Sequence, residues 1–516
     1  MPHNNNSPIA RGFLSMGRSL AVNAERFPNK TAVNDLNGRI TYKDLNAKVN
    51  QLAYGLREVG LQKGEHAAIL FGNTIEHLLM IYAVAKLGAV SVVLDIKWKP
   101  REMTRALRFF DCRVLLYDSR YDSGLTPELL DGLKLGAFSW GGENTSKASI
   151  ADIMRGRPAQ EFPSDVRDED LFMIMLTAGT TGTPKGCLVN HKTYALQCMN
   201  SSIGRGCNEF SKELSVVPIY YNSGRSTVLA HLFFGGTVYL RQRFDAREAL
   251  ELVQNEKINS LGLASTMCHR LLQLPDLDSY DTRSIRALRK AGLPFTRKMV
   301  EGLITRVTPN VFQGYASTDA GQATFLRAEE QLSKIGSSGR PIWGVEVDIV
   351  DDRHDRVSTG KEGEIRVRGP LVCQGYYNNP EEEGRRFIDG WYYSGDIGRF
   401  DPDGYLYVVG RMKDLIKTGG INVAPKEIEE ILLLYPDVID AAVVGEPDPE
   451  WGEAIKAYVV AREEKRLSET DLIKFCKEYL ADYKVPKQIR IVKDLKRNEL
   501  GKLNAKILEE QVNHCQ

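Results

Sequence analysis

Apolar runs of strand length alternate along this chain with longer segments in which apolar side chains recur at helical spacing. Residues 66–71 and 171–176 are short and almost wholly apolar, which is typical of buried strands, whereas residues 75–87 have the apolar spacing of a helix. Residues 363–369 alternate between polar and apolar positions and predict a half-exposed strand. The DPDG sequence at residues 401–404 predicts a turn. Strands alternating with helices indicate an α/β fold built in layers.

The C-terminal residues have the pattern of a separate, smaller α+β unit. Pro425 opens a predicted helix at the position where a missing N–H costs nothing. Residues 439–444 and 454–460 are apolar runs of strand length, and a second predicted helix follows them. We therefore expect a large N-terminal α/β domain with several subdomains over residues 1–411 and a small α+β domain over residues 412–516.

Composition bounds the functions open to this protein. Its 516 residues carry 68 Lys and Arg against 67 Asp and Glu, so the chain has no general attraction for nucleic acid or an anionic membrane. The longest apolar stretch, residues 77–94, is interrupted by Lys86 and is not expected to span a membrane. The eight cysteines form no C-x-x-C pair, which favours free thiols in the cytoplasm. Arg11 and Arg18, with no acid before Glu25, leave a mitochondrial location as the alternative.

The strongest chemical pattern lies at residues 176–186, which read LTAGTTGTPKG. Three glycines, four threonines and Lys185 offer backbone N–H groups, hydroxyls and one mobile positive charge, a combination that suits a chain of phosphates. The segment is not a Walker A loop, because Pro184 stands where that motif requires its second glycine. A polar surface loop is the alternative interpretation.

This loop resembles the phosphate-binding signature of the adenylate-forming superfamily, which contains acyl-CoA synthetases, peptide-synthetase adenylation domains and luciferases. Segments similar to that family's adenine and magnesium, ribose, hinge and catalytic-lysine signatures follow in its order: QGYASTD at residues 313–319, YYSGDIG at 392–398, GRMKDLIKTGG at 410–420 and LGK at 500–502. The resemblance extends from about Leu20 to Leu508 and favours the acyl-CoA synthetase branch. It implies ATP, Mg²⁺ and coenzyme A as cofactors, and a mobile C-terminal lid that turns about Lys413.

The resemblance also assigns roles to individual residues. Asp396 would grip the ribose hydroxyls with its two oxygens, Asp319 would hold Mg²⁺, and Tyr315 would stack on adenine. Lys502 and Lys417 are the implied catalytic residues, because a positive charge on a long stem stabilises negative charge as it shifts at the α-phosphate. The other implied nucleotide- and CoA-binding positions are Thr177, Gly179, Thr180, Thr181, Gly182, Thr183, Lys185, Gly292, Gln313, Gly314, Thr318, Arg411, Gly419 and Gly420.

The sequence departs from the family pattern in the adenine and magnesium segment, at the expected acyl pocket and before Lys502, where the usual proline and threonine are missing. The usual Y-G-x-T-E segment reads YASTD here, so the methyl group of Ala316 crowds a wall beside the acyl group or the nucleotide, and Asp319 is one methylene shorter than Glu. Tyr221 stands where many relatives carry His at the entrance of the acyl pocket. Arg225 is expected near this pocket, where it either pairs with a second carboxylate of the substrate or faces solvent.

The implied reaction has two steps, in which a carboxylic acid attacks the α-phosphate of ATP and the thiol of coenzyme A then displaces AMP. Three alternatives stay open: an adenylation enzyme that loads a carrier-protein thiol, a luciferase-like oxygenase, and a catalytically weak acyl- or nucleotide-binding regulator. Because the chain ends soon after Lys502, we expect no fused carrier domain and favour free CoA. The expected partners are small molecules and, as a further option, a second copy of the chain in a homodimer, rather than nucleic acid or an integral membrane.

Rotation of the C-terminal domain about Lys413 predicts that the two half-reactions depend on different residues. Lys502→Ala should slow acyl-AMP formation by about 10²–10³, the scale on which one electrostatic contact to a transition state is lost. It should spare thioester formation from supplied acyl-AMP, whereas Gly420→Leu should obstruct the thiol channel and spare adenylation. The measurement is to time each half-reaction separately in both variants. Equal damage to both halves in both variants would contradict a rotation between the steps.

Overall fold

The computed structural model describes residues 12–141, 148–177, 185–291, 297–418, 421–449, 451–462, 467–495 and 497. One six-stranded sheet has the order β6-β5-β3-β4-β7-β8. Its strands are β3 (His66–Leu70), β4 (Val90–Val93), β5 (Cys112–Asp118), β6 (Ala137–Trp140), β7 (Leu171–Thr177) and β8 (Lys185–Asn190). They pair in parallel, except that β7 and β8 form an antiparallel hairpin at the sheet edge. The strands expected at residues 66–71 and 171–176 are thus confirmed.

A second, seven-stranded sheet has the order β13-β12-β11-β9-β10-β1-β2, in which β2 is antiparallel to β1 and the other neighbours pair in parallel. Its strands are β1 (Thr31–Asp35), β2 (Gly38–Thr41), β9 (Lys212–Ser215), β10 (Thr237–Leu240), β11 (Ser260–Ala264), β12 (Ala287–Ala291) and β13 (Val311–Phe312). Helix α1 (Met16–Arg26) precedes the strands of both sheets. The helices between those strands are α2 (Tyr42–Glu58), α3 (Ile75–Leu87), α4 (Pro100–Phe109), α5 (Pro127–Asp131), α6 (Ile150–Met154), α7 (His191–Arg205), α8 (Asn222–Phe233), α9 (Ala246–Glu256), α10 (Ser265–Leu272) and α11 (Arg297–Arg306).

Helix α3 joins the two sheets into one core. The hydroxyl of Thr74 accepts a hydrogen bond from the first turn, and Gly88 ends the helix with a left-handed φ of 78°. Every residue from His77 to Leu87 is buried, and one cluster of buried side chains connects α3 with Ile69 of β3 and Val238 of β10. The helix expected at residues 75–87 is confirmed, but it is buried all round rather than along one stripe, because both sheets lie against it.

A third sheet is antiparallel, with the order β18-β19-β21-β20 and β22 paired to β21. Its strands are β18 (Glu346–Val350), β19 (Gly363–Arg368), β20 (Phe387–Ile388), β21 (Trp391–Phe400) and β22 (Leu406–Arg411), and helix α12 (Pro380–Arg386) precedes β20. Two short ladders, β14 (Ala316–Ser317) with β15 (Gly321–Gln322) and β16 (Thr324–Phe325) with β17 (Arg340–Pro341), lie between the second and third sheets in the sequence. The turn expected at residues 401–404 is confirmed, since Asp401 Oδ1 accepts from the backbone N–H groups of Asp403 and Tyr405.

The C-terminal domain is a sheet in the order β24-β23-β26-β25, with β27 beside β26, packed against two helices. Its elements are β23 (Ile416–Thr418), β24 (Ile421–Val423), α13 (Pro425–Leu432), β25 (Val438–Asp448), β26 (Gly452–Ala461), α14 (Glu469–Tyr479) and β27 (Gln488–Val492). The helix expected to open at Pro425 and the two strands after it are confirmed. The boundary expected after residue 411 falls between the end of β22 and the start of β23, and it stays a prediction.

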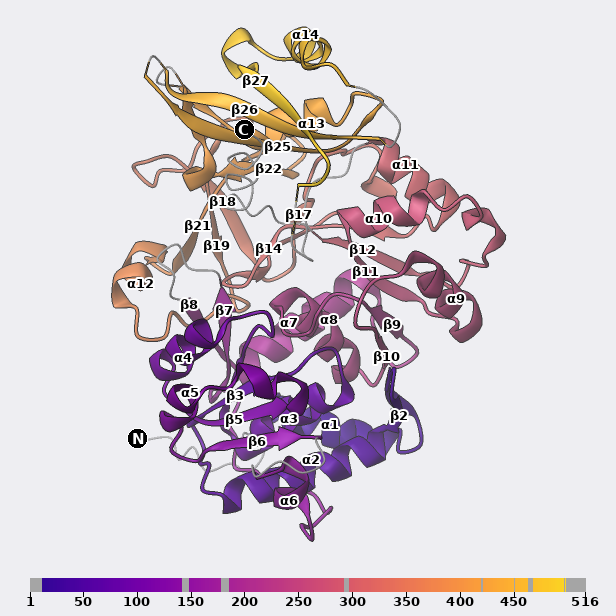
Figure 1. Cartoon of the computed structure of the whole chain (residues 1–516), viewed down its shortest axis with the longest axis vertical. Helices are drawn as coiled ribbons and strands as arrows, with labels where there is room; N and C mark the ends of the chain where they lie inside the picture. Colours follow the sequence, from indigo (N-terminus) through magenta and orange to yellow (C-terminus); the bar gives the residue numbers. More distant parts are fainter. Residues whose placement is uncertain are drawn as a thin grey trace, which may run out of the picture.

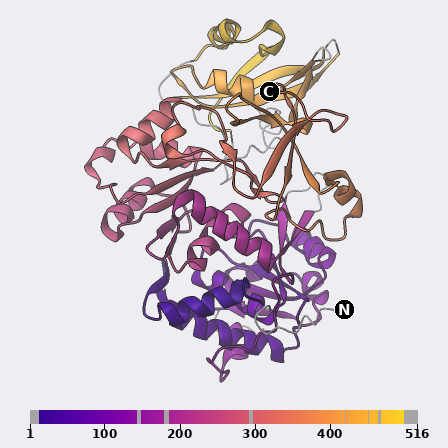
Figure 2. The ribbon, with the colours of Figure 1, turned by 180° about the vertical axis from the view of Figure 1, so that it is seen from behind.

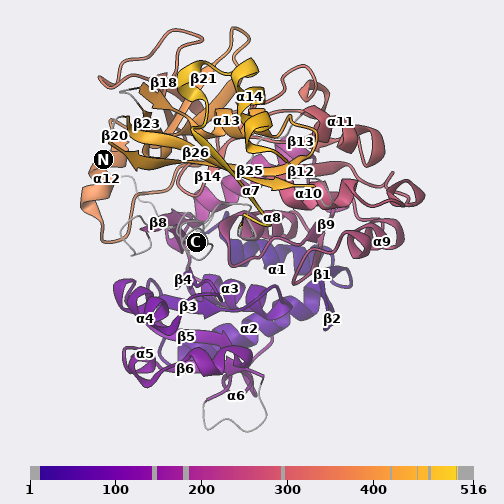
Figure 3. The same cartoon turned by 45° about the horizontal axis from the view of Figure 1, so that its top comes forward.

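The C-terminal domain lies at the end of the molecule opposite to helices α1 and α2, as the yellow and indigo ribbons show from the front and from behind (Figures 1 and 2). Seen with this end turned forward, strands β25 and β26 extend over the region between the third sheet and helices α10 and α11 (Figure 3). Among the described residues, none of the helices combines the length and hydropathy that a transmembrane span requires.

The side chain of Arg497, the last residue that the structure describes, binds to strand β25. Its Nε donates to Asp440 Oδ2 at 2.8 Å, and its Nη2 donates to Asp440 Oδ1 at 3.0 Å and to the carbonyl of Ala441 at 2.7 Å. The Arg497 side chain is 8% exposed, so this two-pronged pair is largely withdrawn from water. The pair therefore holds the chain close to β25 just before the segment that carries Lys502.

Asp440→Ala is expected to lower the free energy of unfolding of the C-terminal domain by about 2 kcal/mol, because it removes two charge-assisted hydrogen bonds from a mostly buried guanidinium. Urea unfolding followed by circular dichroism measures the loss. The matched control is Glu381→Ala, which breaks an ion pair whose side chains are 68% and 78% exposed and should cost less than about 0.5 kcal/mol. Equal effects of the two substitutions would contradict the anchoring role of Asp440.

Candidate functional site

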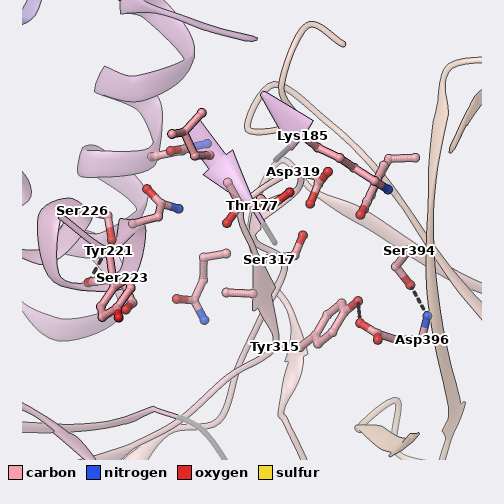
Figure 4. Close-up of a pocket in the computed structure, with 18 of the residues that line it drawn as sticks. Thr177, Lys185, Tyr221, Ser223, Ser226, Tyr315, Ser317, Asp319, Ser394 and Asp396 are labelled. Carbon is pink, nitrogen blue, oxygen red and sulfur yellow. Dashed lines mark hydrogen bonds between the residues drawn. The ribbon is translucent and has the colours of Figure 1, made fainter. Parts of the chain in front are cut away.

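A cavity of about 1620 Å³ lies between the N-terminal sheets, the third sheet and the C-terminal domain. Residues predicted from the sequence line it along its whole length: Thr177, Lys185, Tyr221, Gln313, Gly314, Tyr315, Ala316, Thr318, Asp319, Asp396, Arg411 and Lys413. Figure 4 shows Tyr221 on one side of the cavity and Asp396 on the other, with Thr177, Asp319 and Tyr315 between them. The structure thus brings together residues that are far apart in the chain.

The charge of Lys185 is held at the cavity wall by an acidic helix. Thr177 and Lys185 are cross-strand partners at the mouth of the β7–β8 hairpin, and Lys185 forms an ion pair with Glu382 of α12. Partial burial opposes ionisation of Glu382, but the hydrogen bonds from Lys185 and Arg386 outweigh it and hold the pKa of this carboxyl below its usual value. Lys185 therefore faces the cavity as one half of an ion pair at the base of the expected phosphate loop.

Asp319 is oriented by two donors that use the same oxygen. Its Oδ1 accepts a hydrogen bond from the hydroxyl of Tyr376 at 2.6 Å and from the thiol of Cys187 at 3.5 Å. Burial and the Asp319 carboxylate raise the pKa of Tyr376 well above its usual value, so this phenol stays protonated and donates. Within the described residues, no three His, Cys, Asp or Glu side chains gather into a metal site. A single carboxylate in a cavity still fits Mg²⁺, which is commonly held by one or two carboxylates together with substrate phosphates.

Asp396 lies at the centre of a network between the third sheet and the adenine segment. The hydroxyl of Tyr315 donates to Asp396 Oδ2 at 2.6 Å, and Arg411 Nε lies 3.2 Å from Oδ1. Asp396 and Arg411 are register partners on β21 and β22, so the sheet itself sets their separation. Burial and the Asp396 carboxylate raise the pKa of Tyr315 well above its usual value, so its hydroxyl remains a donor. A carboxylate with an arginine beside it can accept from a pair of sugar hydroxyls.

The start of helix α8 forms the end of the cavity where the sequence predicts that the acid binds, which we call the acid end. Tyr221 precedes this helix, and four polar residues of its first turns also line the cavity: Asn222, Ser223, Ser226 and Thr227. They fall on one face of the helix, which Figure 4 shows turned toward the cavity at Ser223 and Ser226. This end of the site is therefore rich in hydroxyl and amide groups.

Arg225 was expected either to pair with a carboxylate of the substrate or to face solvent, and the structure shows neither. Its side chain is 2% exposed and Nη1 donates to the carbonyls of Ile219 and Tyr220, each at 3.2 Å. It therefore neither faces solvent nor lies among the residues that line the cavity, and burial lowers its pKa. The reason is helical geometry: with about 3.6 residues per turn, position 225 points away from the face that carries Ser223 and Ser226.

The remaining predicted residues divide into two groups. The side chain of Lys417 is exposed on β23 and does not line the cavity, while its backbone N–H donates to Glu453 Oε2 at 2.5 Å. The others lie outside the described residues, so their predicted roles stay predictions: Gly179, Thr180, Thr181, Gly182, Thr183, Gly292, Gly419, Gly420 and Lys502.

Charged residues that the sequence did not single out also line the cavity. They are Arg289 of β12, Glu382 and Arg386 of α12, Lys426 of α13, and also Asp95, Arg101, Glu102 and Arg105. Lys426 Nζ donates to the carbonyl of Val408 on β22 and so connects the C-terminal domain to the third sheet. Strand β12 reads ALRKA and carries two adjacent charges, so its pattern gave no signal specific to Arg289.

Two family models match the chain. Residues 20–377 match the model of the AMP-binding enzyme, and residues 427–502 match that of the AMP-binding enzyme C-terminal domain. Together they cover both parts of the fold around the cavity.

Named relatives and solved structures cover almost the whole chain. A 2-succinylbenzoate–CoA ligase of Bacillus licheniformis is 32% identical over 94% of this chain and 97% of its own, and the long-chain-fatty-acid–CoA ligase FadD13 of Mycobacterium tuberculosis is 30% identical over 92% and 93%. ATP-bound MatB from Rhodopseudomonas palustris superposes with a TM-score of 0.88 at 27% identity, over 96% of this chain and 98% of that one. The anthranilate CoA ligase AuaEII, in complex with anthranoyl-AMP, superposes with a TM-score of 0.89 at 25% identity, over 97% and 98%.

Asp396→Ala is expected to raise the KM for ATP by about 10- to 100-fold, because two hydrogen bonds to a charged acceptor are lost together. The initial rate of pyrophosphate release as a function of ATP concentration measures this. Asp403→Ala is the control, since its carboxylate is 62% exposed, pairs with Lys334 and does not line the cavity. If Asp396→Ala leaves the KM for ATP unchanged, the ribose site lies elsewhere.

Proposed function

Because this chain belongs to the AMP-binding enzyme family, we propose that it is an ATP-dependent ligase that joins a carboxylic acid to coenzyme A through an acyl-AMP intermediate. The observation that carries the proposal is that one cavity contains Lys185, Asp319, Asp396 and Tyr221, contributed by four separate parts of the chain. The names of the relatives, which are CoA ligases for different acids, support the same reaction class.

In this proposal the third sheet binds the nucleoside. Asp396 accepts from the ribose hydroxyls, Arg411 lies beside that carboxylate, and the ring of Tyr315 lies against adenine while its hydroxyl positions Asp396. Lys185 exchanges its partner Glu382 for the phosphates. Since both groups of that pair are partly exposed, the exchange costs little.

Asp319 is the residue proposed to hold Mg²⁺, with Tyr376 and Cys187 fixing the orientation of its carboxylate. When bound, Mg²⁺ would neutralise part of the charge on the phosphates. The contribution of this chain is a single oriented carboxylate, and the substrate supplies the other ligands.

The chemistry is positional and electrostatic. A carboxylate oxygen of the acid attacks the α-phosphorus, the bond to pyrophosphate breaks, and the thiolate of CoA then attacks the acyl carbon and releases AMP. We propose Lys502 and Lys417 as the lysines that act in these steps, the segment at Gly419 and Gly420 as part of the thiol channel, and Lys413 as the hinge. The lining position of Lys413, two residues after the end of β22, supports the last assignment.

The same proposal includes a cytoplasmic location and leaves self-association to experiment. The cysteines of the described residues are free thiols, which suits a reducing compartment. Sedimentation velocity would test the proposed homodimer.

The decisive experiment is a screen of acids for ATP-dependent pyrophosphate release, with and without CoA. We expect pyrophosphate and AMP only with a matching acid, and a thioester only when CoA is present. Aryl, short-chain, medium-chain and dicarboxylic acids should all be included. Lys185→Ala should abolish most of the release without changing the thermal midpoint.

Three results would redirect the proposal. Acyl-AMP formation without transfer to CoA would favour a carrier-protein acceptor. Oxygen consumption with acid and ATP would favour an oxygenase, and nucleotide binding without turnover of any acid would favour a regulatory protein.

A further inference from the structure

Arg289 brings a positive charge into the cavity that the nucleotide and magnesium proposals do not use. It lies on β12, directly opposite Gly262 on the parallel strand β11. A Cβ atom on Gly262 would stand 2.9 Å from Arg289 Nη2. Because Gly262 has no side chain, the guanidinium can lie across β11 and reach the acid end of the cavity.

The guanidinium is held against the cavity face of α8. Arg289 Nη2 donates to the hydroxyl of Thr227 and lies 3.5 Å from the carbonyl of Ser223. The Thr227 hydroxyl donates in turn to that carbonyl at 3.0 Å. These contacts orient Arg289 toward the same helix turns that line the cavity, with neutral oxygens as the partners on α8.

A carboxylate stands behind Arg289, outside the cavity lining. The Cβ position on Gly262 is 3.6 Å from Glu213 Oε1, and Glu213 Oε2 lies 3.5 Å from Nε2 of His231. Glu213 is 1% exposed and does not line the cavity. A buried carboxylate therefore lies near Arg289 without lining the cavity.

Polar side chains line this cavity beside apolar ones such as Tyr220 and Phe325. The Oγ atom of Ser223 is buried and has no hydrogen-bond partner within the described part of the chain, and Gln197 and Ser201 of α7 line the same cavity. Buried polar atoms are nearly always satisfied, so an unmatched hydroxyl on a cavity wall calls for a polar group of the ligand. A hydrocarbon tail would instead dehydrate these groups at a net cost.

We propose that Arg289 binds a second carboxylate, at the far end of the acid substrate, and makes the protein selective for dicarboxylic acids. The inference rests on the ligase function proposed above and names its substrate class. The planar guanidinium matches the two oxygens of a carboxylate, and the Ser223 hydroxyl supplies a further donor. The other carboxylate of the same molecule then points toward the nucleotide.

The test compares diacids with neutral analogues of the same length. Dicarboxylic acids from succinate to suberate and the benzene dicarboxylic acids are assayed for pyrophosphate release, each beside its monoamide. We expect the wild-type protein to prefer at least one diacid over its monoamide by about 10-fold or more. Arg289→Gln should raise the KM for that diacid by about 10- to 100-fold and leave the KM values for its monoamide and for ATP within about two-fold. Arg289→Lys, which keeps the charge, should retain part of the preference.

Arg297→Gln is the matched control, because Arg297 is an exposed residue of α11 that pairs with Glu301 on its own helix. It should leave the preference for diacids unchanged. A merely structural role of Arg289 beside Glu213 would show as a lower thermal midpoint and an equal loss of rate with every acid, and would overturn the proposal.

The two proposals fail in distinguishable ways. Two outcomes would overturn the inference alone: the wild-type protein activates monocarboxylic acids and monoamides as well as diacids, or Arg289→Gln leaves the ratio of the KM values for diacid and monoamide unchanged. In either case Arg289 does not bind a second carboxylate of the substrate, but the ligase function stands. If no acid supports pyrophosphate release, the ligase function fails and the inference fails with it.

Discussion

The charged side chains that line the cavity must be held in position and must still be able to bind a ligand. The geometry of the whole site depends on how the structure meets both conditions. Lys185 pairs with Glu382, and Arg411 pairs with Asp396, in each case between different structural elements. Ion pairs between partly exposed groups are worth about 1 kcal/mol or less. They therefore orient the side chains without locking them, and a phosphate or a pair of hydroxyls can replace one partner at small cost.

The same requirement explains why the cavity lies between sheets rather than within one. A sheet fixes the separation of its own residues, as the register of Asp396 and Arg411 illustrates, but it cannot close around a ligand. In the proposed function, the C-terminal domain is the wall that moves. Lys413 lies two residues after the end of β22, and Lys426 donates to the carbonyl of Val408, a polar contact that a rotation can break and remake.

Local patterns predicted the elements well, because strand and helix periods are properties of neighbouring residues. The contacts of the site were less predictable. The donor to Asp396 is 81 residues away in the chain, and the partner of Lys185 is 197 residues away. Arg225 was selected because it follows Tyr221 closely in sequence, yet the turn of α8 directs it into the core. Arg289 takes its place on the cavity only through the register of β12 beside Gly262, which no single-sequence pattern reveals.

A positive charge that binds the far end of the acid also affects the rate of attack on the α-phosphorus. Attack on the α-phosphorus requires the carboxylate of the acid to approach in line, and freedom of the acid within a cavity of about 1620 Å³ works against this. An acid anchored at its far end by Arg289 and Ser223 loses most of that freedom before the chemical step. Binding energy from the far carboxylate then orients the reacting carboxylate. An acid without the far carboxylate therefore reacts more slowly and also binds more weakly. Selectivity and catalysis in this site thus depend on the same distance, the one between Arg289 and the nucleotide.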